Sequence, residues 1–267
     1  MTVRFDVQDS VAVVTLNRPE ALNALSIEAL GELRKHLCES RDRDDIRVVV
    51  LTGAGTRSFC AGADLKATQT SSVSYAEAVF QNPGKAADLG LYIRLMDLTD
   101  LGLSKPIIAA INGHCLGAGL EIALQSDIRI ASNSATFGLP EAKVGSIPAV
   151  SGLHRLMKAV PSAHAMQMAL TGEHITAQTA KSIGLITEVL DAPDLLTRAL
   201  SIAKKISSNA PLAVQALKCL SRQTQHLSEI DAQALTELYW GILRDTQDRT
   251  EGRKAFSEKR PPIYIGR

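Results

Sequence analysis

Two glutamates stand in segments where an ionised carboxylate is unusual. Glu121 lies in the otherwise apolar stretch 119–124, directly after a glycine-rich turn, and Glu141 follows Pro140 in the turn-rich segment 137–148. Burial raises the pKa of a glutamate toward neutrality, which suits proton transfer. Taken alone, Glu121 has an ordinary explanation, because the helix dipole favours an acidic residue at a helix N-terminus. The pair predicts acid–base chemistry only together with two nearby backbone turns.

These turns are Gly62, within Phe59-Cys-Ala-Gly-Ala-Asp-Leu-Lys66, and Gly117-Ala-Gly119. Each follows a predicted strand, and Ala63 is expected to open a helical turn. The first N–H groups of a helix have no partner within it and attract negative charge. Two such groups aimed at one point form an oxyanion hole. A single glycine turn of this kind is more simply explained by turn chemistry alone.

The elements that must position these residues alternate between strand and helix. The sequence predicts a hairpin over 3–7 and 11–16, a helix over 26–41 and a buried strand over 48–51. A second series follows, with a strand over 106–111, a glycine-rich turn over 112–119, a helix over 120–126 and a strand over 127–131. The repetition of strand, turn and helix predicts stacked α/β layers.

The two ends of this α/β region differ in character. Residues 67–100 are polar at first, with a helical stretch near 89–98, and are expected to form a variable, mobile segment. From about Asp194 onward helical periodicity persists to Phe256, broken at Pro211. We therefore expect an α/β core over 1–195 and a helical region over 196–267.

Composition limits the classes of partner. The chain has 267 residues, of which 45% are hydrophobic and 21% charged, as in ordinary globular proteins. A net charge of +1 and 4% aromatic residues argue against a nucleic-acid surface. We also expect no membrane span, no signal peptide and a cytoplasmic location, because four scattered cysteines are typical of reduced proteins. A small molecule is the expected partner.

Other site types fit the chain less well. A dinucleotide-binding fold is the serious alternative, but Ile122 stands where its third glycine belongs, and no acidic residue ends the strand at Ser132. The six histidines have no metal-ligand spacing, so no metal is expected. Cys60 and Cys115 have no nearby base and are interpreted as small packing residues.

Several ordered motifs resemble the crotonase, or enoyl-CoA hydratase/isomerase, superfamily. The resemblance extends from about residue 3 to 267, so it covers nearly the whole chain. Its motifs are Asn17-Arg-Pro-Glu-Ala-Leu-Asn-Ala24, Phe59–Leu65, Lys105-Pro-Ile-Ile-Ala-Ala-Ile-Asn-Gly113, Gly117–Ala123, Phe137–Pro148 and the tail Glu251–Arg260.

The resemblance implies a crotonase-like spiral of ββα units with a C-terminal helical trimerisation region. It also implies acyl-CoA thioester substrates and homotrimers or hexamers. No metal is implied, and no cofactor beyond the coenzyme A of the substrate. By position, Ala63 and Ala118 supply the oxyanion hole, and Glu121 and Glu141 match the catalytic glutamates. The remaining implied contacts are Ala63, Asp64, Leu65, Lys66 and Ala118 for the substrate, with Arg18, Lys259 and Arg260 as candidates for the CoA phosphates.

The resemblance identifies the superfamily, but it leaves several reactions of that superfamily open. Because both glutamates are present, reversible hydration of a 2-enoyl-CoA, as in fatty-acid β-oxidation, is the leading hypothesis. A double-bond isomerase, a carnitinyl-CoA dehydratase-like lyase and a weakly catalytic acyl-CoA binding protein remain alternatives, with a nicotinamide oxidoreductase far behind. The chain departs from the family at 147–155, where the bulkier Val150 and Leu153 are expected to reshape the acyl pocket.

Overall fold

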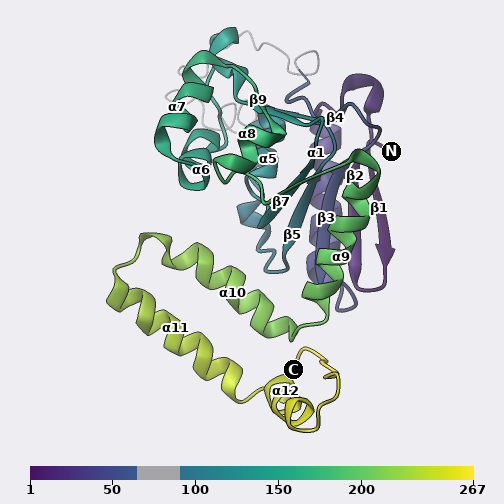
Figure 1. Cartoon of the computed structure of the whole chain (residues 1–267), viewed down its shortest axis with the longest axis vertical. Coiled ribbons are helices and arrows are strands. Elements are labelled where there is room, and N and C mark those ends of the chain that lie inside the picture. The colour runs from purple at the N-terminus through teal and green to yellow at the C-terminus, as the bar shows by residue number, and fades with distance from the viewer. Residues whose placement is uncertain (65–90) are drawn as a thin grey trace.

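The computed structural model describes residues 1–64 and 91–267, in which two β-sheets are surrounded by helices (Figure 1). The strands are β1 (Val3–Gln8), β2 (Val11–Leu16), β3 (Val48–Gly53), β4 (Ser58–Cys60), β5 (Ile107–Ile111), β6 (His114–Leu116), β7 (Ile128–Ser132), β8 (Thr136–Gly138), β9 (Ile175–Thr176) and β10 (Glu188–Leu190). The larger sheet has the order β1-β2-β3-β5-β7-β10, and the smaller sheet has the order β4-β6-β8-β9.

Most neighbouring strands are parallel. In the larger sheet only β1 and β2 are antiparallel, and they form the predicted hairpin with Val3 opposite Leu16. In the smaller sheet β4, β6 and β8 run parallel, and β9 pairs with β8 in the antiparallel direction. The strands predicted at 48–51, 106–111 and 127–131 are confirmed as β3, β5 and β7.

The helices follow the predicted pattern in the first and last parts of the chain. The α-helices are α1 (Ile27–Asp42), α4 (Leu91–Met96), α5 (Ala118–Ala123), α6 (Gly152–Ala159), α7 (Ser162–Thr171), α8 (Ala177–Ser182), α9 (Leu195–Ser207), α10 (Pro211–Gln223), α11 (Glu229–Arg244) and α12 (Gln247–Ser257). Short 3-10 turns are η1 (Pro19–Ala21), η2 (Thr99–Leu101), η3 (Pro140–Val144), η4 (Ala192–Asp194) and η5 (Thr224–His226). Of the segment predicted to be variable, 67–90 lies outside the described residues, and α4 falls within its predicted helical stretch.

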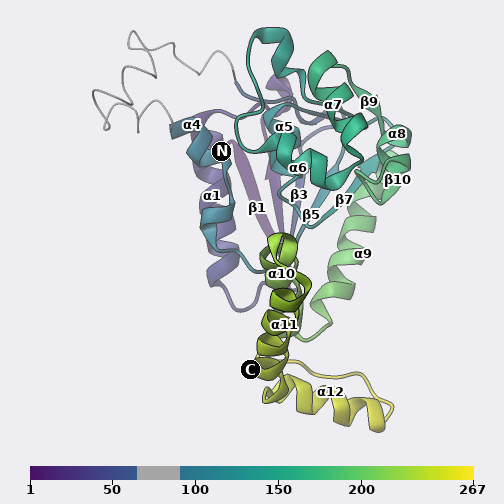
Figure 2. The same cartoon turned by 90° about the vertical axis from the view of Figure 1, so that its left-hand side faces the viewer.

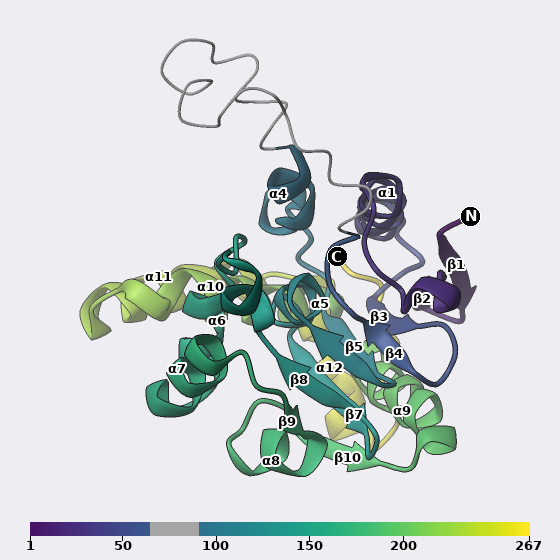
Figure 3. The same cartoon turned by 90° about the horizontal axis from the view of Figure 1, so that it is seen from above.

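Both faces of the large sheet are buried, each against a different helix. Val48, Val50 and Ile108 belong to one apolar cluster with residues of α9, and the alternating residues Val49 and Leu51 belong to a second cluster with residues of α1. Figure 3 shows α1 and α9 on opposite sides of the strands. Because a parallel strand is covered on both faces, its sequence is apolar at every position instead of alternating.

A ββα unit repeats along the core. β3 continues into β4, β5 continues through β6 into α5, and β7 continues through β8 into η3 and α6. The first strand of each unit joins the large sheet and the second joins the small one. The sequence prediction missed β4 and β6, because a three-residue strand is too short to show a measurable periodicity. Ala63 forms a parallel bridge with Leu25, and the helical turn predicted to begin at Ala63 extends into residues outside the described part of the chain.

The C-terminal helices α10, α11 and α12 extend away from the sheets (Figures 1 and 2). α10 is fastened to the core by the buried Lys218, whose Nζ lies 2.8 Å from a carboxylate oxygen of Asp127 and donates to the carbonyl of Lys105 at 2.7 Å. Asp127 in turn accepts from the amide of Ile107 at the start of β5. Within 1–64 and 91–267, no helix is both long and apolar enough to cross a membrane.

The buried contact of Lys218 leads to a prediction about stability. Replacing Lys218 with Met removes the ammonium and leaves Asp127 without its nearest cation, because Arg222 approaches it only to 3.7 Å. We expect the free energy of unfolding to fall by about 3 kcal/mol in urea denaturation. The exposed Lys204→Met should change it by less than about 0.5 kcal/mol. Equal stability of the two variants would refute this role of Lys218.

Candidate active site

The Glu121 side chain is buried and its carboxylate is held by backbone amides. Glu121 projects from α5 and is 2% exposed. Its Oε1 accepts hydrogen bonds from the amides of Val150 at 2.7 Å and Gly152 at 3.1 Å. Between them, Ser151 has a φ of 57°, a left-handed conformation uncommon for a side chain other than glycine. The segment expected from sequence to reshape the acyl pocket therefore also holds Glu121.

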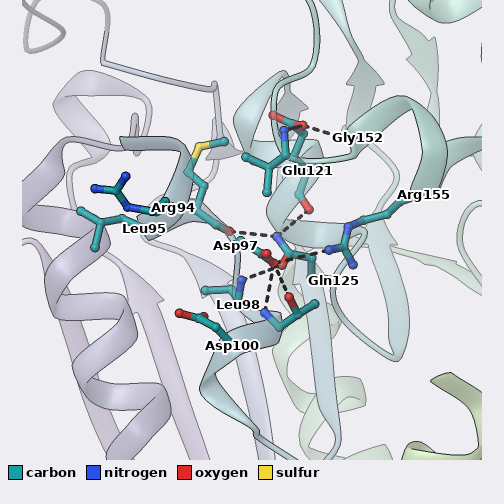
Figure 4. A network of polar contacts seen from close by, with 12 residues as sticks. Arg94, Leu95, Asp97, Leu98, Asp100, Glu121, Gln125, Gly152 and Arg155 are labelled. Atoms are coloured by element: carbon teal, nitrogen blue, oxygen red, sulfur yellow. Dashed lines mark hydrogen bonds and ion pairs between the residues drawn. The ribbon is translucent and has the colours of Figure 1, made fainter. Parts of the chain in front are cut away.

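Gly152 is a close steric neighbour of the same carboxylate. A Cβ placed at Gly152 would lie 2.6 Å from Glu121 Oε1 and 2.7 Å from its Cγ. Only glycine fits at this position without moving the side chain of Glu121. Figure 4 shows this contact at one end of a larger polar network.

The carboxylate of Glu141 lies against the second glycine-rich turn. Glu141 belongs to η3, and a Cβ added at Gly117 would be 3.1 Å from its Oε1. The other oxygen, Oε2, is buried and has no hydrogen-bond partner in the described part of the chain. Glu121 and Glu141 thus differ: the first carboxylate is anchored by amides, and the second has an oxygen available for another partner.

Burial affects the titration of both glutamates, and the charge of Glu121 also affects that of Glu141. Burial raises the pKa of Glu121, while the amides of Val150 and Gly152 act in the opposite direction. Burial also raises the pKa of Glu141, and the negative charge of Glu121 raises it further. Both carboxyl groups therefore hold a proton more readily than an exposed glutamate, which suits exchange of a proton with a bound molecule. The charge of Glu121 thus acts on the carboxyl group of Glu141.

The two glycine-rich turns are also brought together. A Cβ at Gly62, whose φ is +113°, would lie 3.3 Å from the carbonyl oxygen of Leu116 and 3.8 Å from the amide nitrogen of Ala118. At Gly119 an added Cβ would collide with the carbonyl of Cys60, so the first turn of α5 packs directly on the end of β4. Ala118 and the residue after Gly62, Ala63, are the two positions predicted to supply amides. The two turns therefore approach each other closely at Gly62 and Ala118.

Gln125 joins the helix of Glu121 to the segment after α4. Its side-chain amide donates to the carbonyls of Met96 at 3.0 Å and Glu121 at 3.2 Å, and its oxygen accepts from the amide of Leu98 at 2.8 Å. All three bonds are buried, so Gln125 fixes the position of α5 relative to α4 (Figure 4). Sequence reasoning missed this residue, because a glutamine near the end of a short helix carries no signal of its partners.

Tyr92 of α4 is a second residue that the sequence did not single out. Its hydroxyl donates to the carbonyl of Leu25 at 3.3 Å, and Leu25 forms the bridge with Ala63. Burial raises the pKa of the Tyr92 phenol, and negative charge at Cys60, Glu121 and Asp64 raises it further. The phenol thus lies beside the segment that pairs with Ala63. Tyrosine within a predicted helical stretch gave no indication of this position.

The cysteines at the turns are confirmed as packing residues. Cys60 and Cys115 are fully buried. Burial raises the pKa of the Cys60 thiol to about 12 and raises that of Cys115 well above its ordinary value. Both thiols are therefore protonated near neutral pH, and neither is an activated nucleophile.

The candidate ligands of the CoA phosphates lie in different places. Arg18 donates to the carbonyl of Ala24 at 3.0 Å and its guanidinium lies 2.9 Å from the carboxylate of Asp64, next to Ala63. Leu65 and Lys66 lie outside the described residues. At the end of α12, Lys259 is exposed and Arg260 pairs with Glu251 and Glu258. Figure 1 shows α12 far from α5 in the molecule, so within one chain the segment that follows α12 is remote from the helix that contains Glu121.

The tight fit at Gly152 generates a prediction. In Gly152→Ala the new methyl group displaces the Glu121 carboxylate and weakens its buried hydrogen bonds, so the free energy of unfolding should fall by about 2 kcal/mol. The matched control is Gly31→Ala in α1, where an added Cβ meets nothing within 4 Å. That variant should be about 0.5–1 kcal/mol more stable than the parent. Both are measured by urea denaturation, and an unaltered Gly152→Ala would contradict the steric argument.

The electrostatic pairing predicts a shift in titration. Glu121→Gln removes the charge that raises the pKa of Glu141, so this pKa should decrease toward the ordinary value of 4.5. The pH dependence of the carboxyl C=O band in infrared difference spectra measures it. A raised folded-state pKa favours the protonated form, so its contribution to stability is complete below about pH 4.5 and is lost as pH rises through the folded-state pKa. An unchanged or higher pKa of Glu141 in the variant would exclude the coupling.

Comparisons with known proteins establish the family of the chain. The model of the enoyl-CoA hydratase/isomerase family matches residues 6–267. (E)-benzylidenesuccinyl-CoA hydratase of Thauera aromatica is 44% identical over 266 residues, covering 100% of both chains, and carnitinyl-CoA dehydratase of Proteus mirabilis is 38% identical, covering 97% of this chain and 96% of its own. The crystal structure of an enoyl-CoA hydratase from Bacillus anthracis superimposes with a TM-score of 0.89 at 35% identity over 100% of both chains. The chain therefore belongs to the enoyl-CoA hydratase/isomerase, or crotonase, family and has its fold.

Proposed function

We propose that this chain is a hydro-lyase that reversibly adds water across the 2,3 double bond of a 2-enoyl-CoA thioester. The observation that supports this most directly is the pair Glu121 and Glu141, two electrostatically coupled carboxyl groups with raised pKa values beside the two glycine turns. The reaction uses water and the thioester alone, since coenzyme A is part of the substrate.

The proposed oxyanion hole activates the substrate. The amides of Ala63 and Ala118 donate hydrogen bonds to the thioester oxygen and stabilise the negative charge that develops there as the enolate forms. This makes the β-carbon electrophilic and the α-carbon basic. In other enzymes, removal of one such donor lowers the rate by about 10²–10³. The approach of Gly62 to the amide of Ala118 is the geometry that favours this role.

The two glutamates then direct the addition of a hydroxyl group to the β-carbon and a proton to the α-carbon. Glu121 orients and deprotonates the water, whose oxygen forms a bond to the β-carbon while the π electrons move toward the thioester oxygen. Those electrons return to the α-carbon, which takes a proton managed by Glu141, on the same face. Glu121 gains one proton and Glu141 loses one, so the total number of protons on the enzyme is unchanged, and transfer of the proton from Glu121 to Glu141 restores the starting state. Because coupled carboxyls titrate as a pair, the two roles are exchangeable in this scheme.

The CoA part of the substrate is proposed to lie along the segment that begins at Ala63. Ala63, Asp64, Leu65 and Lys66 line the thioester arm, and Arg18 contributes positive charge nearby. In a homotrimer or hexamer, Lys259 and Arg260 of a neighbouring subunit contact the CoA phosphates. Large exposed apolar side chains on the C-terminal helices favour such an assembly, among them Ile230, Trp240, Ile242 and Phe256.

The acyl group is proposed to be bulkier than a short straight chain. The relative from Thauera aromatica, whose name specifies an aromatic, branched acyl group, shares 44% identity, against 38% for the short-chain-enoyl-CoA hydratase of Clostridium acetobutylicum. The substrate test therefore includes (E)-benzylidenesuccinyl-CoA beside crotonyl-CoA. A cytoplasmic reaction in the degradation of acyl-CoA esters fits this substrate class.

A double-bond isomerase is the second candidate. It needs one carboxyl group that moves a proton between two carbons, and the unpartnered Oε2 of Glu141 favours such a role. The isomerase transfers no oxygen to its product. It therefore differs from the hydratase in the fate of labelled water.

The proposed reaction predicts that Glu121→Gln and Glu141→Gln each lower kcat/KM for hydration by about 10²–10⁴, because each removes a proton carrier. The assay follows loss of the enoyl thioester absorbance with both substrates. Glu173→Gln is the control, since Glu173 is exposed on the surface. Unchanged rates in both active-site variants would overturn the assignment.

Labelled water separates the two candidates. A hydratase incorporates oxygen-18 from H₂¹⁸O into the 3-hydroxyacyl product of a 2-enoyl-CoA. Conversion of a 3-enoyl-CoA to its 2-enoyl isomer without label, dependent on Glu141 and independent of Glu121, would establish the isomerase instead.

A further inference from the structure

A polar cavity of about 520 Å³ lies beyond the C-terminal end of α5, where it is lined by Gln125 and the residues after it, away from the glycine turn. One wall is formed by the residues that follow α5 and by α6, and the opposite wall by the last part of α10 with η5. The charged residues that line it are Arg129, Arg155, Lys158, Arg222 and a single acidic residue, Asp127. The cavity therefore has an excess of positive charge.

The positive charges of the cavity are poorly compensated. Nζ of Lys158 contacts only neutral acceptors, Gln225 Oε1 at 3.0 Å and a ring nitrogen of His226 at 3.1 Å, and it has no acidic partner in 1–64 or 91–267. Arg222 lies 3.7 Å from Asp127, but that carboxylate already accepts from Lys218 and from a backbone amide. The carboxylate of Asp127 is thus shared by two cations, Lys218 and Arg222.

Two hydrogen-bonding groups at the cavity lack a partner. Ser126 is 6% exposed, and its Oγ has no hydrogen-bond partner among the residues described. Nε of Arg155 is likewise buried and unpartnered, while another nitrogen of the same guanidinium lies 3.5 Å from Asp97. Burial lowers the pKa of Arg155, the negative charge of Asp97 raises it, and the positive charge of Arg222 lowers it. The two guanidinium groups repel each other across the space between them.

We propose that this cavity binds a small multivalent oxyanion of the phosphate type. Such an ion offers several acceptor oxygens to the donors of Lys158, Arg155 and Arg222, and charge-assisted hydrogen bonds of this kind are the stronger ones in proteins. Its negative charge relieves the repulsion between the cations. The site is separate from the carboxylates of Glu121 and Glu141, and its occupation does not depend on which reaction they catalyse.

The cavity is nevertheless connected to the Glu121 carboxylate. The amide of Arg155 donates to the carbonyl of Ser151 at 2.8 Å, and Ser151 lies between the two residues whose amides bind Glu121. An anion that draws the Arg155 side chain toward itself therefore acts on the loop that holds Glu121.

Isothermal titration calorimetry of the full chain with inorganic phosphate, at ionic strength held constant with chloride, tests the proposal. We expect saturable binding of one phosphate per chain, weakened about tenfold or more in Lys158→Ala and in Arg222→Ala. Lys158→Arg, which keeps the charge, should retain binding. Lys181→Ala, on the exposed surface of α8, is the matched control and should bind as the parent does.

Circular dichroism establishes that each variant is folded before titration. Absence of saturable binding by the parent would overturn the proposal. Equal affinity in Lys158→Ala, Arg222→Ala and the control would also overturn it, because phosphate would then bind elsewhere. If phosphate does not bind but Arg222→Ala changes the oligomeric state in light scattering, the cations are satisfied by a second copy of the chain and the anion site is rejected.

Discussion

Burial of the Glu121 carboxylate is the constraint on which the site depends. A carboxylate that is 2% exposed requires compensation, and Glu121 receives it from backbone amides that precede and open α6. This explains the left-handed φ of Ser151, which turns the amides on either side of it toward one oxygen, and it explains why Gly152 has no side chain. The carboxylate thus determines the local conformation of a loop far from it in sequence.

The spiral of ββα units supplies the second requirement, a close approach of two turns. Each unit leaves the large sheet and continues into the small one, so β4 and β6 lie side by side and end near one another. The glycines at their ends allow backbone to meet backbone: Gly119 against Cys60, and Gly62 against Leu116. Because β4 and β6 are paired by hydrogen bonds, the distance between the turns is set by strand pairing and not by flexible side chains. α4 then contacts both sides through Tyr92 and the partners of Gln125.

The sequence predicted those strands, turns and site residues whose residue types themselves determine the structure. It did not predict features that depend on a backbone group or on a partner distant in the sequence. The apolar run Val48–Leu51, the glycine turns and the two glutamates could be recognised because each carries its own chemical signal. The three-residue strands β4 and β6 are too short for periodicity. The partners of Glu121 are amides, which every residue except proline possesses, so Val150 was noted for its bulk and nothing identified it as a partner of Glu121. Gln125 likewise has a role only through contacts that tertiary packing creates.

The net charge of +1 conceals a separation of charge along α5. Two carboxyl groups lie toward the glycine turn, and an excess of cations lies beyond Gln125. Arg155 stands between these regions, and its charge counteracts the rise in the Glu121 pKa that burial produces. Since the rise prevails, the carboxyl remains easier to protonate than an exposed one, yet amides and a cation stabilise its ionised form. A carboxyl group that must accept and return a proton needs its protonated and ionised forms to be similar in free energy. The opposing effects of burial and of nearby positive charge bring these two free energies closer together.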